Sequence, residues 1–202
     1  MPQELFTIGH SNHELPRLLE LLRAHAITAI ADVRSEPYSQ YTPQFNREVL
    51  EQSLKQAGVQ YVFLGVELGA RRAELGCYVN GRAEYGRIAK LPLFAQGLER
   101  VRRGAQTHRV ALMCSEKDPI TCHRTILVCR NLRDTDRRIA HILEDGTIET
   151  HEAAERRLMD EMGVAAEDLF CTAAERLEQA YDMQAAKIAY VTPGGRLQGA
   201  PS

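Results

Sequence analysis

Short apolar runs alternate with longer segments of helical periodicity along this chain, and this alternation restricts its fold more than any other feature. LFTIG at 5–9 precedes a segment at 13–25 with leucines at helical spacing, and ITAIADVR at 27–34 precedes another at 45–58. Further strands are expected at 59–65, 109–114 and 137–143, and further helices at 91–104 and from Pro119 to about Leu132. This order predicts a mostly parallel sheet with helices on both faces.

Five such units are too few for an eight-stranded barrel, so we expect an open α/β sheet of about five strands. EDGT at 144–147 predicts a turn, after which IETH returns as the second strand of a C-terminal hairpin. Two helices are expected within 152–190, separated near 163–168. No repeat or linker divides the chain, so we expect a single domain at 1–190 and a disordered tail at 191–202.

Local residue types mark several helix ends. Gly58 and Gly104 are expected to stop the helices that precede them, because glycine readily adopts the left-handed conformation found just after a helix. Asp118 is the expected N-cap of the helix that starts at Pro119, where the missing N–H of proline costs no hydrogen bond.

Composition excludes several classes of protein. A net charge of −2 leaves no chain-wide basic footprint for nucleic acid. No apolar run reaches the roughly 18–20 residues that span a bilayer, and MPQELFTIGH lacks the basic and apolar regions of a signal peptide. Five cysteines, an odd number, do not suggest a secreted disulfide scaffold. We expect a cytoplasmic protein without a membrane partner.

Polar clusters follow four of the expected strands. They are GHSN at 9–12, DVRS at 32–35, GVELG at 65–69 and CSE at 114–116. Parallel strands with right-handed crossovers bring all their carboxyl ends to one edge of the sheet, where ligands bind in open α/β folds. The sequence therefore predicts a ligand or active site at that edge.

Each candidate also has a structural interpretation. His10 can cap the following helix, Asp32 can form an ion pair with a nearby arginine, and Cys114 can be a small buried hydrophobic residue. Cys129 and Cys171 lie inside helical patterns, and we interpret both as structural.

The segment TCHR at 121–124 strengthens the case for chemistry. Cys122 is expected in the opening turns of a helix, where unpaired N–H groups and the helix dipole lower the pKa of a thiol. His123 and Arg124 can add to this effect, and Arg124 suits an oxyanion or phosphate. The alternative is that Cys122 faces the sheet together with Ile126 and Cys129.

A long polar segment at 68–87 and a shorter one at 35–45 are candidate lids over an anionic or aromatic ligand. The first carries Arg71, Arg72, Arg82, Arg87, Tyr78 and Tyr85, and the second carries Tyr38, Tyr41 and Phe45. A solvated charged loop is the alternative for the first segment.

These segments together resemble the family catalogued as domain of unknown function 488. The matching pieces include TIGHSN at 7–12, ADVRSEPYS at 31–39, YVFLGVELGARR at 61–72, LMCSEKDPITCHR at 112–124 and AHILEDGTIETH at 140–151. The resemblance implies a compact α/β domain whose hallmarks fall on His10, Asp32, Arg34, Cys114, Glu116, Cys122, His123 and Arg124. Where the family often has two glycines, this chain has Gly69 and Ala70.

We expect an enzyme, a hydrolase or group transferase, that acts on a small anionic or nucleotide-like substrate. The expected catalytic residues are Cys114, Glu116, Cys122, His10 and Asp32, and the expected substrate-binding residues are Ser11, Arg34, Arg71, Arg72, His123 and Arg124. Cys114 or Cys122 would be the nucleophile. The sequence identifies no cofactor.

Two other hypotheses use the same edge. The first is a metal site, because thiolate, imidazole and carboxylate ligands suit zinc or iron. Its expected ligands are Cys114, Cys122, His123 or His10, and Asp32, although their spacing in the sequence is not a standard zinc pattern. A non-catalytic module for nucleotides or single-stranded nucleic acid is the other hypothesis, and the low net charge argues against long duplex contacts.

Overall fold

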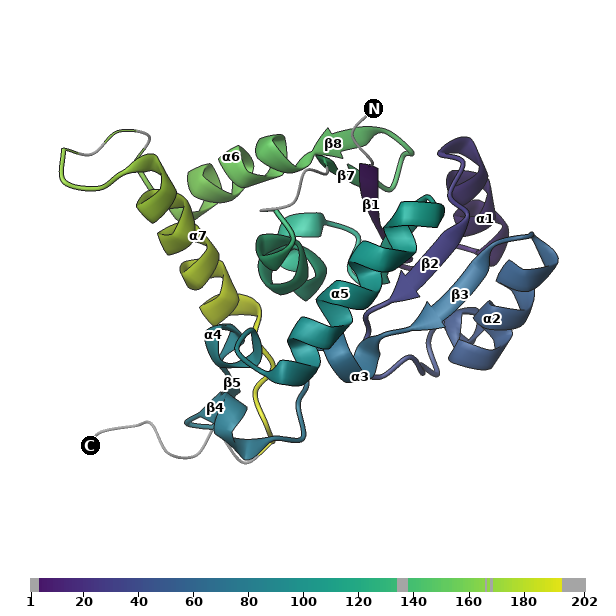
Figure 1. Ribbon diagram of the computed structural model, residues 1–202, viewed down its shortest axis with the longest axis horizontal. Coiled ribbons are helices and arrows are strands. Elements are labelled where there is room, and N and C mark those ends of the chain that lie inside the picture. The colour runs from purple at the N-terminus through teal and green to yellow at the C-terminus, as the bar shows by residue number, and fades with distance from the viewer. Residues whose placement is uncertain (1–3, 134–137, 166, 168, 194–202) are drawn as a thin grey trace.

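The computed structural model describes residues 4–133, 138–165, 167 and 169–193. Its main sheet has the order β3-β2-β6-β1-β7-β8, and its first five strands are parallel (Figure 1). These strands are β1 (Glu4–Gly9), β2 (Ala29–Asp32), β3 (Gln60–Phe63), β6 (Val110–Cys114) and β7 (Arg138–Ile142). The last strand, β8 (Ile148–Thr150), pairs antiparallel with β7 as the expected hairpin. The predicted open α/β fold is confirmed.

The helices cover both faces of this sheet. The longer ones are α1 (Leu15–Ala24), α2 (Arg47–Gln56), α5 (Pro92–Thr107), α6 (His151–Met162) and α7 (Ala173–Ile188). Shorter elements are η1 (Pro43–Phe45), α3 (Gly65–Leu68), η2 (Leu75–Cys77), the strand pair β4 (Tyr78–Val79) and β5 (Arg82–Ala83), and α4 (Tyr85–Ile88). Three helical turns follow β6, namely η3 (Pro119–Thr121), η4 (Arg124–Val128) and η5 (Cys129–Asn131).

Alternate residues of the central strands enter two separate cores. In β6, Leu112 packs on the side of α5 and α7, whereas Met113 packs on the side of α1 and α2. In β2, Ala31 and Ile30 divide in the same way. Because successive side chains of a strand point to opposite faces, a sheet covered on both sides needs apolar residues at every position. This requirement explains the continuous apolar runs in the sequence.

The register of the strands aligns their carboxyl ends. Gly9 lies opposite Cys114, and Asp32 lies opposite Met113. The segment after Cys114 then crosses close above β1, because a Cβ atom added to Gly9 would lie 1.9 Å from the carbonyl oxygen of Glu116. The predicted convergence of strand ends at one edge is therefore present.

One expected helix end and one expected continuous helix are wrong. The helix α5 continues through Gly104 to Thr107, since this glycine lies against β6, where its nearest external contact is Val110. The expected helix from Pro119 to Leu132 is broken, because Cys122 is extended, with φ −128° and ψ 142°. Asp118 does cap the first turn, by accepting a hydrogen bond from the Ile120 N–H.

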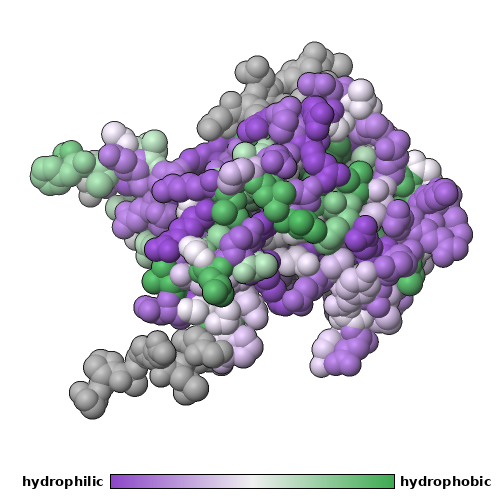
Figure 2. Space-filling view, turned by 60° about the horizontal axis from the view of Figure 1, so that its bottom comes forward, coloured by the Kyte–Doolittle hydropathy of each residue, from purple (hydrophilic) through white to green (hydrophobic). Residues whose placement is uncertain are grey.

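The end of α2 and the gap between the last two helices agree with the predictions. Gly58 follows α2 with a φ of 75°, in the left-handed region that favours glycine. Leu169 and Phe170 precede α7 and are almost fully exposed, on a loop that projects from the body of the protein (Figure 2).

The C-terminal segment returns to the carboxyl edge of the sheet. Val191 forms a bridge with Arg82, and the Thr192 N–H donates to the Gly81 carbonyl at 2.8 Å. Of the expected tail at 191–202, residues 194–202 lie outside the described part of the chain.

Candidate functional site

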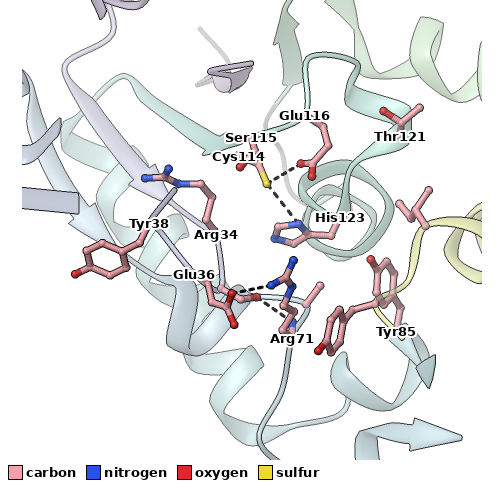
Figure 3. Close-up of a pocket in the computed structure, with 14 residues that line it drawn as sticks. Arg34, Glu36, Tyr38, Arg71, Tyr85, Cys114, Ser115, Glu116, Thr121 and His123 are labelled. Atoms are coloured by element: carbon pink, nitrogen blue, oxygen red, sulfur yellow. Dashed lines mark hydrogen bonds and ion pairs between the residues drawn. The ribbon is translucent and has the colours of Figure 1, made fainter. Parts of the chain in front are cut away.

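A cavity of about 410 Å³ opens at the carboxyl edge of the sheet (Figure 3). Its lining comes from the exits of β2 and β6, from the two predicted lid segments and from the end of α7. The lining residues are Arg34, Ser35, Glu36, Tyr38, Ala70, Arg71, Tyr85, Cys114, Ser115, Glu116, Thr121, His123, Ile188 and Tyr190. Its volume falls within the usual range for small-molecule sites, about 300–1,000 Å³.

Two thiols, a carboxylate and an imidazole gather beside this cavity, and all of them except the Cys122 thiol belong to residues that line it. The Sγ atoms of Cys114 and Cys122 each lie 3.0 Å from Oε2 of Glu116. Nδ1 of His123 lies 3.5 Å from the Cys114 Sγ (Figure 3). Cys114 and Cys122 are buried, whereas Glu116 is exposed as a residue and turns its carboxylate toward both sulfurs. We call these four residues the thiol cluster.

The break at Cys122 is what brings this cluster together. The Cys122 carbonyl accepts hydrogen bonds from the Thr125 and Ile126 N–H groups, and its Sγ accepts one from the Arg124 N–H at 3.4 Å. Cys122 therefore caps the second helical segment, so its sulfur does lie at a helix start. This start is one turn later than the sequence predicts.

A backbone carbonyl orients the imidazole of His123. Its Nε2 lies 2.9 Å from the Val33 carbonyl oxygen, which can only accept a hydrogen bond. Nε2 must therefore carry a hydrogen, and Nδ1 is the nitrogen that gains or loses a proton beside Cys114. Burial by itself lowers the pKa of His123, but the hydrogen bond and negative charge of Cys122 raise it above its ordinary value.

The surroundings shift the pKa values of the two thiols in opposite directions. Burial opposes the ionisation of Cys122, but the hydrogen bond from Cys114 and the charge of Arg124 lower the Cys122 pKa well below its ordinary value. Burial and the neighbouring Cys122 raise the pKa of Cys114. The surroundings therefore favour a thiolate at Cys122, whereas Cys114 keeps its proton until a base accepts it.

Asp32 does not line the cavity, and its carboxylate holds Arg34 in place. Nε of Arg34 donates to Oδ1 at 2.9 Å, and Nη2 donates to Oδ2 at 2.6 Å. Tyr61 donates a further hydrogen bond to Oδ2 at 2.7 Å. Asp32 is fully buried, with both carboxylate oxygens occupied, so the structure gives it the ion-pair role that the sequence left open.

His10 lies behind Arg34. Its ring stacks on Phe45, Nδ1 lies 2.8 Å from the Ser11 carbonyl oxygen, and Nε2 lies 3.2 Å from Nη1 of Arg34. These partners require a hydrogen on Nδ1 and a lone pair on Nε2. Burial and then the charge of Arg34 lower the His10 pKa to about 4, so this imidazole is neutral at pH 7. His10 does not line the cavity either.

Three expected substrate-binding residues lie away from the cavity. Arg124 is fully buried and donates to the carbonyls of Glu116 and Lys117, which holds the loop after β6 in place. Arg72 is engaged by Glu74 and by backbone carbonyls. The Ser11 N–H donates to the Ser115 carbonyl at 2.8 Å. None of the three lines the cavity. Their hydrogen bonds stabilise the loops around it.

Arg34 and Arg71 are the arginines that reach the cavity. Four of the five N–H groups of Arg34 meet Asp32, His10 and the Phe45 carbonyl, which leaves one Nη1 hydrogen without a partner among the described residues. Nη1 of Arg71 donates to Glu36 at 2.7 Å, and its guanidinium lies 4.8 Å from the centre of the Tyr190 ring.

The two predicted lid segments contribute unequally. Tyr38 and Tyr85 line the cavity, whereas Phe45 is buried beside His10 and Tyr41 is 87% exposed. Tyr78 contacts the backbone of Arg72, outside the cavity lining.

Ile188 and Tyr190 are lining residues that the sequence did not predict. They come from the C-terminal segment, which the backbone hydrogen bond from the Ala83 N–H to the Tyr190 carbonyl ties to β5. Nothing near Tyr190 in the sequence indicates a site, because no strand ends there. Thr121 and Ser115 were also missed, although both lie within the segment that carries the thiol cluster.

Comparison with known proteins gives one match. The family described as "Domain of unknown function DUF488" matches residues 14–130, more than half of the chain. The match includes the thiol cluster and Arg34 but ends before Ile188 and Tyr190. No curated protein and no solved structure matches the chain. Among the described residues, no helix has both the length and the apolar character needed to cross a membrane.

Proposed function

The chain belongs to the family described as domain of unknown function DUF488, and we propose that it is an enzyme that acts on a small anionic or nucleotide-like substrate. The proposed reaction is hydrolysis or group transfer, with Cys114 as the nucleophile and His123 as its proton acceptor. The family description names no activity, so the support for this proposal comes from the geometry of the cavity.

The contact between Cys114 and His123 carries the proposal. The sulfur lines the cavity, and the one ring nitrogen of His123 that can exchange a proton lies 3.5 Å from it. The Val33 carbonyl fixes this orientation from the other side of the ring. A nucleophile beside a base that a third group orients is the arrangement of known cysteine enzymes.

The reaction follows from this arrangement. The Cys114 proton passes to Nδ1 of His123, and the sulfur attacks the electrophilic atom of the substrate. The bond to the leaving group breaks, and the leaving group takes the proton from His123. The group left on sulfur is then transferred to water in a hydrolysis, or to a second substrate in a group transfer.

Two arginines support the choice of an anionic substrate. Arg34 offers one Nη1–H that has no partner in the described part of the chain, and Asp32 holds its guanidinium in place. Arg71 lies at 50% side-chain exposure between Glu36 and Tyr190. Arginine binds phosphate and carboxylate oxygens through charge-assisted hydrogen bonds. Tyr38 and Tyr85 offer aromatic surface in the same cavity, which suits a base or another planar group.

We also propose a cytoplasmic location. Cys77, Cys114, Cys122 and Cys129 are thiols, and a reducing compartment keeps thiols in that state.

Cysteine labelling of metal-free protein at pH 7 tests the proposed nucleophile. We expect iodoacetamide to label Cys114 at least about tenfold faster than the exposed Cys171, because Nδ1 of His123 accepts the Cys114 proton as the sulfur attacks. In His123→Gln, labelling of Cys114 should slow by about 100-fold, the scale of general-base assistance. Peptide mass spectrometry assigns each labelled cysteine.

His108→Gln is the matched control, because His108 contacts Thr107 far from the cavity lining and should leave the labelling rate unchanged. Labelling of Cys114 no faster than Cys171 would remove Cys114 as the nucleophile. So would equal rates in the wild type and His123→Gln.

A non-catalytic nucleotide module is the competing function. Such a module would bind a mononucleotide through Arg34 and Arg71 without needing a reactive thiol. Turnover of a nucleotide or phosphoester mixture that stops in Cys114→Ala supports the enzyme. Binding without turnover in both proteins supports the module.

A further inference from the structure

The thiol cluster has a second property, which concerns only the positions of its donor atoms. Sγ of Cys114, a carboxylate oxygen of Glu116, Sγ of Cys122 and a ring nitrogen of His123 all lie within 4.8 Å of one another. Among the described residues, no other group of three or more histidines, cysteines and acidic residues is this compact. Four donor atoms at such distances can surround a single ion.

The distances are close to those of a tetrahedral zinc site. Zinc bonds of about 2.0–2.3 Å require neighbouring ligand atoms roughly 3.3–3.8 Å apart. The donor contacts of the thiol cluster are 3.0 Å between each sulfur and Glu116, and 3.5 Å between Cys114 and His123. These three contacts are within about half an ångström of tetrahedral spacing, and the other donor pairs, all within 4.8 Å, have to adopt the same spacing when the ion binds.

The surroundings support the ligands in the way that metal sites require. A histidine ligand normally donates its other ring N–H to a carbonyl or carboxylate, as His123 does to Val33. The Arg124 N–H donates to the sulfur of Cys122 at 3.4 Å, which favours a thiolate there.

The charges also balance. A divalent ion with two thiolates and one carboxylate carries a net charge of −1, and the Arg124 guanidinium supplies the opposite charge in the same buried region. Without the ion, two thiolates and a carboxylate at these distances repel one another strongly.

We propose that the thiol cluster binds one thiophilic divalent cation, preferably Zn²⁺, through Cys114, Glu116, Cys122 and His123. Two thiolates and an imidazole are soft and borderline donors, which select zinc over magnesium or calcium. The ligand set differs from the one that the sequence suggested. Asp32 and His10 both contact Arg34, and Glu116 is the fourth ligand instead.

The ion would control the reaction proposed above. It would occupy the sulfur of Cys114 and Nδ1 of His123, the two atoms that thiol attack requires. The metal-loaded and reactive forms are therefore mutually exclusive, and zinc inhibits the enzyme. This consequence rests on the proposed function, whereas the metal site itself rests only on the geometry of the four donors.

Titration of the metal-free protein with Co²⁺ alone tests the site, because cobalt replaces zinc and is visible in absorption spectra. We expect saturation at one equivalent, with a sulfur-to-cobalt charge-transfer band and the intense visible bands of a tetrahedral ion. Added Zn²⁺ should displace the cobalt. Weaker bands typical of six-coordinate cobalt, or no saturation, would overturn the proposal.

Variants identify the ligands. Cys122→Ser should weaken zinc binding by more than about 100-fold, whereas Cys129→Ser, a buried cysteine outside the cluster, should bind as the wild type does. Equal affinities in both variants would contradict the assignment. Glu116→Ala removes one donor and repeats the test if Cys122→Ser does not fold.

Protection of the wild-type protein separates this proposal from the proposed function. One equivalent of Zn²⁺ should stop the labelling of Cys114 by iodoacetamide and leave the labelling of Cys171 unchanged. If zinc does not bind but Cys114 reacts rapidly, the metal site fails and the thiol enzyme stands. If zinc binds but the metal-free Cys114 reacts no faster than Cys171, the enzyme fails and the metal site stands.

Discussion

Cys122 and His123 are neighbours in the chain, and both side chains reach the same cluster. The Cys122 sulfur contacts Glu116, and Nδ1 of His123 contacts the sulfur of Cys114. Cys122 is extended and His123 is helical, so the change of backbone conformation between them turns both side chains toward the end of β6. Departures from regular α-helix often occur at functional sites.

Gly9→Ala should disturb the thiol cluster from the far side of the β6 loop. The added Cβ would lie 1.9 Å from the Glu116 carbonyl oxygen, so the loop has to move. We expect a loss of about 1–3 kcal/mol in the free energy of unfolding, as for other overpacked positions. Labelling of Cys114 should change as well.

Gly76→Ala is the control for this substitution. A Cβ on Gly76 meets no atom within 4 Å, so the free energy of unfolding should change by less than about 0.5 kcal/mol. Urea denaturation measures both variants, and equal stabilities would contradict the close approach at Gly9.

Asp32→Asn should strongly destabilise the protein. It leaves the buried Arg34 guanidinium without its ionic partner, and such a loss costs about 3–5 kcal/mol in the free energy of unfolding. Glu36→Gln breaks the ion pair between Glu36 and Arg71, whose side chains are 69% and 50% exposed. This substitution should lower the free energy of unfolding by no more than about 1 kcal/mol. Similar losses in both variants, measured by urea denaturation, would refute the distinction between them.

Two buried histidines should make stability depend on pH. His141 lies 3.0 Å from His151, which also contacts the Tyr181 hydroxyl. Burial lowers the pKa of both imidazoles below 6.5. Above pH 6.5 both are neutral in the folded and unfolded states, so their contribution is complete. As pH falls below 6.5, only the unfolded state gains protons, and the free energy of unfolding falls by up to about 1.4 kcal/mol per pH unit for each histidine.

Unfolding experiments at pH 7 and pH 5.5 measure this dependence. His151→Gln should reduce the slope between these pH values, because one titrating group is lost. Tyr181→Phe removes a hydrogen bond but no group that titrates there, so it should lower stability at both pH values and keep the slope. An unchanged slope in His151→Gln would contradict the assignment.

Tyr190 should strengthen anion binding by holding Arg71 at the cavity. The guanidinium lies 4.8 Å from the ring centre, and a cation–π contact at an exposed site contributes about 0.5–1 kcal/mol. With inorganic phosphate as the probe in calorimetry, Tyr190→Leu should therefore weaken binding about two- to fivefold. Tyr190→Phe keeps the ring and should bind as the wild type does. The idea fails if both variants behave alike.

The arrangement of strands could be predicted because it follows from local periodicity. Buried strands and amphipathic helices leave different repeats in the sequence, and parallel strands place all their exits at one edge. The helix end at Gly104 could not be predicted in this way, because a glycine stops a helix only where the chain has no packing reason to continue. Here α5 continues along β6.

The residue types of the candidate site were also visible in the sequence, but not the direction in which each side chain points. Cys114, Glu116, His123, Arg34 and Arg71 line the cavity as expected. Asp32 and Arg72 instead pair with Arg34 and Glu74, each two residues away. His10 and Ser11 instead contact Arg34 and Ser115, which are distant in sequence.

The sequence by itself determined the strand and helix order and the edge of the sheet where polar groups collect, because both depend on short-range patterns. Only the tertiary structure decided that Asp32 and His10 support Arg34, that Arg124 holds the Glu116 loop, and that Tyr190 completes the cavity. A buried charge has to find its partner wherever the folded chain places one. Packing between distant segments selects among the candidate partners, as where Tyr61 joins Arg34 at Asp32, and local sequence patterns do not record that packing.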